Sequence, residues 1–76
     1  MNTYIMHNGI AIKLISTIKK SDTKTWETIV HPVADHFYAK HPWYEVITDV
    51  VIDQATATNW FKAKINHWKM YYKYSI

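Results

Sequence analysis

The chain has 76 residues, enough for one domain and close to the lower limit for a domain that folds without a disulfide or a metal. It contains no cysteine, so neither a disulfide nor a thiolate-held zinc ion can stabilise it. Hydrophobic residues make up 49% of the chain and aromatic residues 16%, with one glycine and two prolines. This composition argues against disorder and predicts a single domain over residues 1–76.

The net charge of +3 arises from nine lysines and six acidic residues, and the chain has no arginine. Arginine is the preferred residue for bidentate contacts with guanine and phosphate, so its absence argues against sequence-specific DNA recognition. Lysines still permit sequence-independent contact with phosphates. The first residues lack the pattern of a secretory signal, and no stretch has the roughly 18 consecutive apolar residues of a membrane span. We therefore expect a cytoplasmic protein without a membrane partner.

Residues 3–7 and 10–19 are predicted to form an antiparallel hairpin. Between them, Asn8 and Gly9 form the dipeptide that a two-residue type I′ turn prefers, because both central positions need positive φ. Large aliphatic residues then occupy even-numbered positions after the turn: Ile10, Ile12, Leu14 and Ile18. This alternation is typical of a half-buried strand.

The segment that follows contains a strand and a short helix in the interpretation we favour. β-Branched and aromatic residues indicate a strand over 24–30. Pro32 can then be the first residue of a helix over 32–40, a position in which proline is well tolerated.

The alternative for this segment is one kinked helix over 22–40, capped by Ser21 or Asp22. It arises because apolar residues in this stretch also recur at helical spacing. Pro32 removes a backbone donor and disfavours helical angles in the residue before it, which argues against an unbroken helix.

After Pro42, alternating residues over 43–52 predict another strand, and Asp53 is a candidate N-cap for a helix with residues 54–58 as its first turns. The predicted fold class is α+β. A small antiparallel sheet, made of the N-terminal hairpin and one or two further strands, would pack against a short helix and a long C-terminal helix.

The C-terminal helix carries more large apolar residues than a small domain can cover. One stripe is expected to face the core: Ala57, Phe61, Ile65, Trp68 and Tyr72. A second, polar stripe is expected to face solvent: Asn59, Lys62, Asn66, Lys69 and Lys73. A third arc remains that neither stripe covers.

This third arc is the candidate binding surface. We predict that it contacts a protein partner or a second copy of the chain through Trp60, Lys64, His67, Met70, Tyr71 and Tyr74. Tyrosine, tryptophan and methionine are enriched at interfaces, and an exposed apolar patch on a small protein usually marks a contact site. A basic rim of Lys62, Lys69 and Lys73 would steer the surface toward an acidic partner.

The alternative function is binding of single-stranded nucleic acid or RNA through the same helix. Its lysines, including Lys62, Lys69 and Lys73, would follow the phosphate backbone while the aromatic rings stack on unpaired bases. Phosphate contacts weaken steeply with salt, whereas apolar docking changes little, so salt separates the two functions.

No motif points to catalysis, a cofactor or a metal. His31, His36 and His41 are spaced five apart, which does not place them on one helix face as a metal site would require. Two acid–base pairs can be considered, Asp35 with His36 and His67 with Tyr71, but neither lies in a recognisable catalytic motif. The nucleotide-binding glycine motifs are absent. We expect a protein that is not an enzyme and that binds no cofactor.

In size and composition the chain is similar to the small accessory proteins that phages and other mobile elements encode to bind and block host machinery. The features that carry this resemblance are its shortness, the absence of cysteine, its abundant lysine and tyrosine, the single hairpin and the lack of a catalytic signature. The resemblance implies an inhibitor that acts by occupying a surface of its target.

Overall fold

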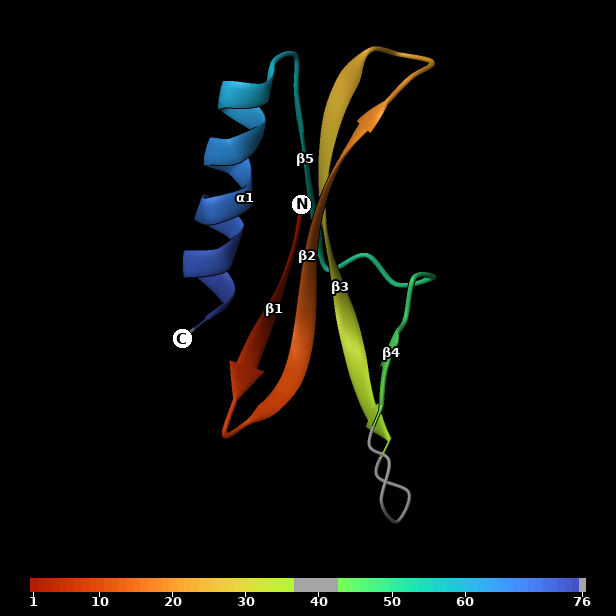
Figure 1. Cartoon of the computed structure of the whole chain (residues 1–76), viewed down its shortest axis with the longest axis vertical. Helices are drawn as coiled ribbons and strands as arrows, with labels where there is room; N and C mark the ends of the chain where they lie inside the picture. The colour runs from red at the N-terminus through yellow and green to blue at the C-terminus, as the bar shows by residue number, and fades with distance from the viewer. Residues whose placement is uncertain (37–42, 76) are drawn as a thin grey trace.

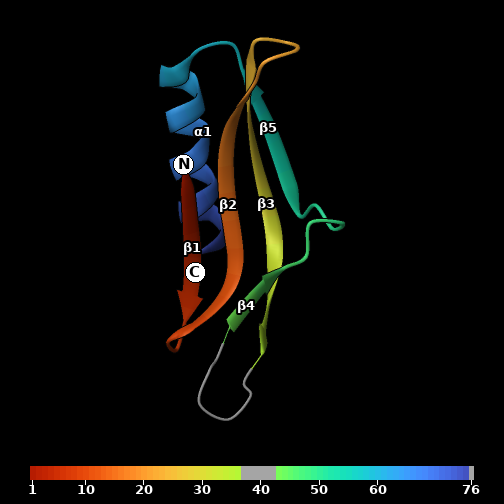
Figure 2. The same ribbon diagram turned by 45° about the vertical axis from the view of Figure 1, so that its right-hand side comes forward.

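The computed structural model describes residues 1–36 and 43–75. These residues form five strands and one helix: β1 (Asn2–His7), β2 (Ile10–Lys20), β3 (Thr25–His36), β4 (Trp43–Val46), β5 (Asp53–Ala57) and α1 (Trp60–Tyr74). All strand pairings are antiparallel, and β1, β2 and β3 are neighbours in that order. On its other side β3 pairs first with β5 and then with β4. α1 covers one face of this sheet (Figures 1 and 2).

The α+β class and the N-terminal hairpin are confirmed. Asn8 and Gly9 both have positive φ, 52° and 77°, as the type I′ turn requires. The hairpin has one irregularity, a β-bulge where the register shifts between Ile5 and Met6. The sheet has more strands than predicted, and the described residues contain no second, short helix.

The strand predicted over 24–30 is present and longer than expected, because β3 continues to His36. The helix predicted over 32–40 is therefore wrong for residues 32–36, and its remainder lies outside the described residues. The alternative helix over 22–40 is also wrong for residues 22–36, and its remainder likewise lies outside the described residues. Pro32 fits within β3 because its carbonyl faces away from β2 and accepts the Ile47 N–H at 3.0 Å. The missing proline N–H would point the same way, so the β2–β3 ladder loses no hydrogen bond.

The second half of the chain differs from its prediction in two places. The strand expected over 43–52 ends at Val46, and Asp53 begins β5 instead of capping a helix. The N-cap is Asn59, whose side-chain oxygen accepts the Lys62 N–H at 2.9 Å. Periodicity did not reveal β5 because its alternation is between alanines and polar residues, a pattern that helices also tolerate.

The core lies between α1 and the sheet, and its centre is a buried cluster of Ile5, Ile15, Val30 and Met70. Two small residues let the layers approach closely, because Ala57 on β5 and Ala63 on α1 are both buried.

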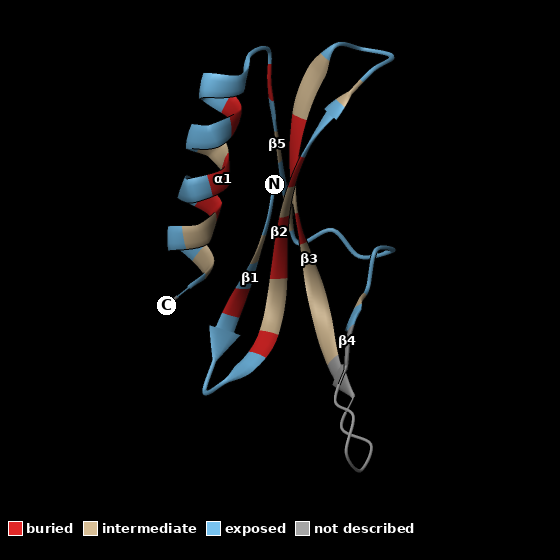
Figure 3. Cartoon of the chain, in the orientation of Figure 1, coloured by how far each residue is buried: buried red, intermediate tan, exposed pale blue. Residues whose placement is uncertain are grey.

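The rotation of α1 about its axis is the reverse of the one predicted. Four residues expected in the core are exposed instead: Phe61, Ile65, Trp68 and Tyr72. Ala57, the fifth, is buried but belongs to β5. The buried side of the helix is the arc predicted to be exposed, as Figure 3 shows by colour, with Ala63, His67 and Met70 against the sheet. Both apolar stripes of α1 have the same spacing, so periodicity alone could not distinguish them.

Replacing Met70 by alanine tests this rotation. Met70 is 9% exposed within the core cluster, so the change should lower the free energy of unfolding by about 2–4 kcal/mol through lost burial and a residual cavity. Tyr72 is 70% exposed, so its replacement by alanine should change that free energy by less than about 0.5 kcal/mol. Urea unfolding measures both, and a larger loss for Tyr72→Ala would contradict the observed rotation.

Candidate functional site

The outer side of α1 carries a continuous row of large apolar side chains that nothing in the described structure covers. This row, the outer ridge, consists of Phe61, Ile65, Trp68 and Tyr72. Phe61 is 72% exposed and Tyr72 is 70% exposed. Residues at i, i+4, i+7 and i+11 share one face of a helix, so the four side chains form a single stripe along α1.

Lysines flank the outer ridge. Lys64 and Lys69 line, together with the four ridge residues, a shallow depression of about 420 Å³. Lys62 is also exposed, and within the described part of the chain no ion pair engages any of these three lysines. Apolar anchors bordered by free cations are suited to a partner that is apolar at its centre and acidic at its rim.

The positive charge of the protein is concentrated in α1. Four of the nine lysines and none of the six acidic residues lie between Trp60 and Tyr74. The rest of the chain therefore has five lysines and six acidic residues, a formal charge of −1 against +4 for the helix. The net charge of +3 is thus entirely a property of the helical layer.

The buried side of α1 is anchored by His67, which is 0% exposed. Its Nε2 hydrogen-bonds with Thr3 Oγ1 at 2.8 Å and its Nδ1 with Thr17 Oγ1 at 2.7 Å. Thr17 Oγ1 in turn lies 2.9 Å from Thr28 Oγ1. In the neutral ring one nitrogen donates and the other accepts, and hydroxyl groups can complement both. Burial lowers the pKa of His67, and the nearby Met1 ammonium lowers it further.

A second polar anchor lies near the C-terminal end of α1. The Tyr74 hydroxyl donates to Asp53 Oδ2 at 2.7 Å and Lys73 Nζ donates to the same oxygen at 2.9 Å. The other oxygen, Oδ1, accepts the Gln54 N–H at 2.8 Å. These hydrogen bonds lower the pKa of Asp53 to about 2, and the bond from Tyr74 has the largest effect. The anchor ties the last turn of α1 to the start of β5.

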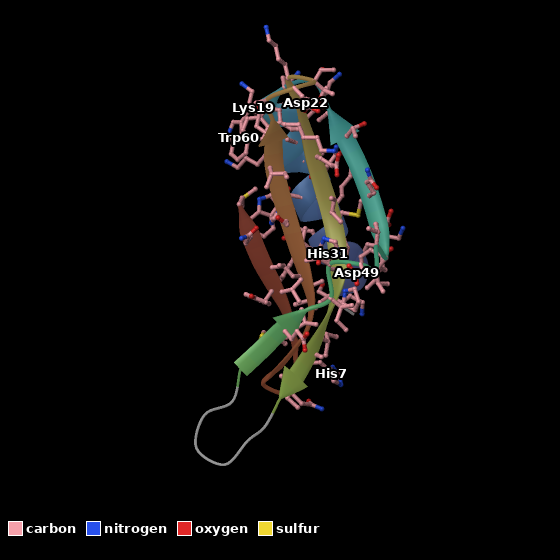
Figure 4. All side chains as sticks on the ribbon, turned by 90° about the vertical axis from the view of Figure 1, so that its right-hand side faces the viewer. His7, Lys19, Asp22, His31, Asp49 and Trp60 are labelled. Carbon is pink, nitrogen blue, oxygen red and sulfur yellow. The ribbon has the colours of Figure 1, made fainter. Side chains whose placement is uncertain are left out.

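The first turn of α1 meets the sheet through a pair of indole rings. Trp60 packs on Trp26 of β3 with 4.8 Å between ring centroids, and Lys19 Nζ lies 5.9 Å from the Trp26 ring. In Figure 4, Lys19 and Trp60 lie at the same end of the molecule as Asp22 in the β2–β3 turn. Trp60 is 45% exposed, so this pair is only partly buried.

The residues predicted to bind a partner are divided between the two sides of α1. Their predicted exposure was wrong for four, which are buried or half-buried against the sheet: His67, Met70, Tyr71 and Tyr74. Trp60 and Lys64 are exposed. The three lysines predicted as a basic rim are exposed too, namely Lys62, Lys69 and Lys73. Lys64 and Lys69 lie together beside the outer ridge, whereas Lys73 pairs with Asp53.

The outer ridge was not predicted to be a surface, because its helical spacing is also that of a core-facing stripe. A signal that could have identified the buried side is polar: His67 shares its stripe with the small Ala63, and hydroxyl residues on the predicted strands, Thr3 and Thr17, can satisfy a buried imidazole.

The arrangement of the other titratable groups does not form a metal centre within residues 1–36 and 43–75, where no three histidines or acidic residues cluster. His31 Nδ1 donates to the Val50 carbonyl at 2.8 Å. His41 and the side chains of Asp35 and His36 lie outside the described residues. His67 and Tyr71 were considered as an acid–base pair. The His67 ring is inaccessible to solvent, and both of its nitrogens are hydrogen-bonded to threonines, so no substrate can reach it in this structure.

The chain matches no protein-family model, no curated protein and no solved structure. Among the described residues, no helix is both long enough and apolar enough to cross a membrane. Any function assigned to this protein therefore rests on its own geometry.

The depressed pKa of His67 predicts a loss of stability in mild acid. Below about pH 6.5 this ring becomes protonated in the unfolded chain but stays neutral in the folded protein. The free energy of unfolding should therefore decrease as the pH is lowered, until the pH reaches the folded-state pKa of His67. Urea unfolding at pH 7.5 and pH 5 measures the loss. His67→Gln should reduce it, whereas His7→Gln, at an exposed position, should not. An equal pH dependence in the His67 variant would contradict this role.

The Asp53 anchor predicts a separate titration at lower pH. Tyr74→Phe removes the bond that contributes most to the low pKa of Asp53, so this pKa should rise from about 2 toward its usual range near 4. Lys73→Met should raise it too, because it removes both the Lys73 hydrogen bond and the positive charge beside the carboxylate. Carbon-detected NMR titration of the carboxyl group measures both variants, and an unchanged pKa in either one would contradict the assigned causes.

Proposed function

We propose that this protein is a non-enzymatic binding module that docks through the outer ridge of α1 onto a protein partner. The partner would offer an apolar groove with an acidic rim, and the module would act sterically by occupying that groove. The observation that carries the proposal is the four-residue apolar ridge, exposed along the helix and bordered by unpaired lysines.

The spacing of the ridge supports a helix-in-groove mode of recognition. Anchors at i, i+4, i+7 and i+11 are the positions that a groove-bound helix inserts into its partner. Phe61, Trp68 and Tyr72 supply aromatic anchors of the kind that dominate binding energy. The helix is already folded on its sheet, so binding would not require the ordering of a free peptide.

The lysine flanks support a partner of opposite charge. Lys64 lies on one side of the ridge and Lys69 on the other, so acidic groups on both walls of a groove would be within reach. Rim charges of this kind act on the association rate and on its salt dependence more than on the final affinity.

The nucleic-acid alternative uses the same surface and remains a second candidate. Phe61 and Tyr72 are exposed enough to stack on bases, and the lysines could follow a phosphate backbone. The mixture of an aliphatic side chain, Ile65, with the rings and the lack of arginine favour a protein groove over a base-stacking track.

Site-specific photo-crosslinking tests the proposal. A benzoylphenylalanine placed at position 61 should give covalent adducts with protein in extract of the cells in which this chain occurs. The same probe at Met6, an exposed position on β1, is the control and should not give them. Adducts that form equally from Met6 would contradict the ridge as the docking surface, and adducts that nuclease removes would identify nucleic acid instead.

The partner captured in this way then allows a quantitative comparison. Phe61→Ser combined with Tyr72→Ser should weaken its binding at least tenfold, equivalent to about 1.4 kcal/mol or more, while the protein stays folded. Met6→Ser should leave the affinity unchanged. Lys64→Glu combined with Lys69→Glu should lower the association rate. An affinity that falls steeply with salt, in proportion to several phosphate contacts, would again favour nucleic acid.

A further inference from the structure

The outer ridge has the spacing of a coiled-coil seam. Its residues follow one another along α1 at intervals of four, three and four: Phe61, Ile65, Trp68 and Tyr72. This is the order d, a, d, a of the heptad abcdefg, in which a and d are the apolar positions that face a second helix. A helix that packs on a broad surface has a wider apolar stripe, so the narrow seam favours a helical partner.

The same register accounts for the side of α1 that meets the sheet. Ala63 and Met70 occupy the f positions, which lie opposite the seam, and both are buried. In Figure 1, α1 lies on one side of the sheet, and no other described element lies beyond it. A second helix could therefore reach the seam without displacing α1 from the sheet.

The depression on the ridge has the shape that a coiled coil requires. In a coiled coil, each a or d side chain of one helix enters a hole between four residues of the other. Residues at i, i+3, i+4 and i+7 enclose such a hole, and the lining of the depression consists of two of these sets. They are Phe61, Lys64, Ile65 and Trp68, and then Ile65, Trp68, Lys69 and Tyr72. The depression can thus receive two successive side chains of a facing helix.

Lysines occupy the heptad positions that select a partner. Lys62 and Lys69 are at e positions and Lys64 is at a g position, and all three are exposed. The e and g residues of facing helices form ion pairs across the seam and determine which helices pair. Because α1 contains no acidic residue, the facing helix must supply the carboxylates.

A second copy of α1 is a poor occupant of this seam. In a parallel pair of helices, the g position of one faces the next e position of the other, so Lys64 would face Lys69 twice. In an antiparallel pair, e faces e and g faces g, and lysine again meets lysine. Like charges that face one another suppress such pairing. The seam therefore suits a foreign, acidic helix better than its own copy.

We propose, on the basis of the docking function of the ridge, that the partner element on it is a single acidic amphipathic α-helix. Its a and d side chains enter the two holes, and carboxylates at its e and g positions pair with the three lysines. Because the ridge is built of large side chains, the a and d residues that face it should be smaller, such as leucine or alanine. A helix as short as the ridge is marginally stable alone, so it either belongs to a folded partner or folds on binding.

Selection from a library of helical peptides tests the proposal. The peptides have about three heptads, aliphatic residues at a and d, and glutamate, glutamine or lysine at each e and g position. The immobilised wild-type protein should enrich glutamate at e and g. Lys64→Glu combined with Lys69→Glu should reverse this preference to lysine. Lys19→Glu combined with Lys24→Glu is the matched control, the same change in charge at exposed residues outside α1, and should still enrich glutamate.

A selected peptide then gives the affinity. Its twin with lysine at every e and g position should bind at least tenfold more weakly, as should the original peptide to the Phe61→Ser and Tyr72→Ser double variant. In an NMR titration the shifted resonances should belong to residues 61–72 and not to Met6.

Several results would overturn the acidic helix as the occupant. They are a wild-type protein that enriches no glutamate, a preference that the charge reversal leaves unchanged, and a peptide that binds the serine double variant equally well. Tighter binding of single-stranded oligouridylate or of anionic phosphatidylglycerol vesicles at physiological salt would overturn it too.

The helix preference and the docking function can fail separately. If position 61 gives protein adducts in extract but the library shows no preference, the ridge docks onto something other than a helix. If the library enriches glutamate but no adducts form, the seam recognises acidic helices and the docking function is wrong.

Discussion

The hydrogen bonds between the buried His67 ring and the hydroxyl groups of Thr3 and Thr17 fix the rotation of α1 on the sheet. If the helix were turned to bury its outer ridge, Thr17 and Thr28 would lie beneath apolar side chains without His67 as their partner. A buried polar group left unsatisfied costs about 1–3 kcal/mol. The Tyr74 and Asp53 bond and the packing of Trp60 on Trp26 hold the two ends of the helix in the same rotation.

This polar constraint explains why the largest apolar side chains of the helix are on the surface. Burial of Phe61 and Trp68 would gain more apolar area than burial of Ala63, so area alone favours the opposite rotation. Ala63 instead allows the helix backbone to approach the sheet closely, and Met70 completes the central cluster with Ile5 and Ile15. The surface therefore keeps an apolar stripe that the fold itself does not use.

Features set by neighbouring residues could be predicted from the sequence, and features set by distant pairing could not. The Asn8–Gly9 turn specifies its hairpin locally, and the C-terminal helix follows from its composition. The course of β3 through Pro32 depends on which neighbour its carbonyl meets, here Ile47, and no local pattern contains that information. β5 was mistaken for helix because Asp53 resembles a cap, although its carboxylate is committed to Tyr74 and Lys73.

The kinds of residue that form the candidate site could be predicted from the sequence, but the side of α1 on which they lie could not. Lysines beside an aromatic stripe on the last helix were expected, and Lys64 and Lys69 do border such a stripe. The stripe itself was assigned to the wrong side, because two apolar rows with equal spacing differ only in the strand residues they meet. The positive charge of the molecule is gathered in the helical layer, on the side that carries this stripe.

The contact between Trp26 and Trp60 gives the protein an intrinsic optical reporter. Indole rings this close couple their electronic transitions, and the coupled pair gives a paired band of opposite signs in circular dichroism that separated tryptophans do not give. One ring belongs to the sheet and the other to the first turn of the helix. That band therefore registers the separation of the two layers directly, even under conditions in which each layer keeps its own secondary structure.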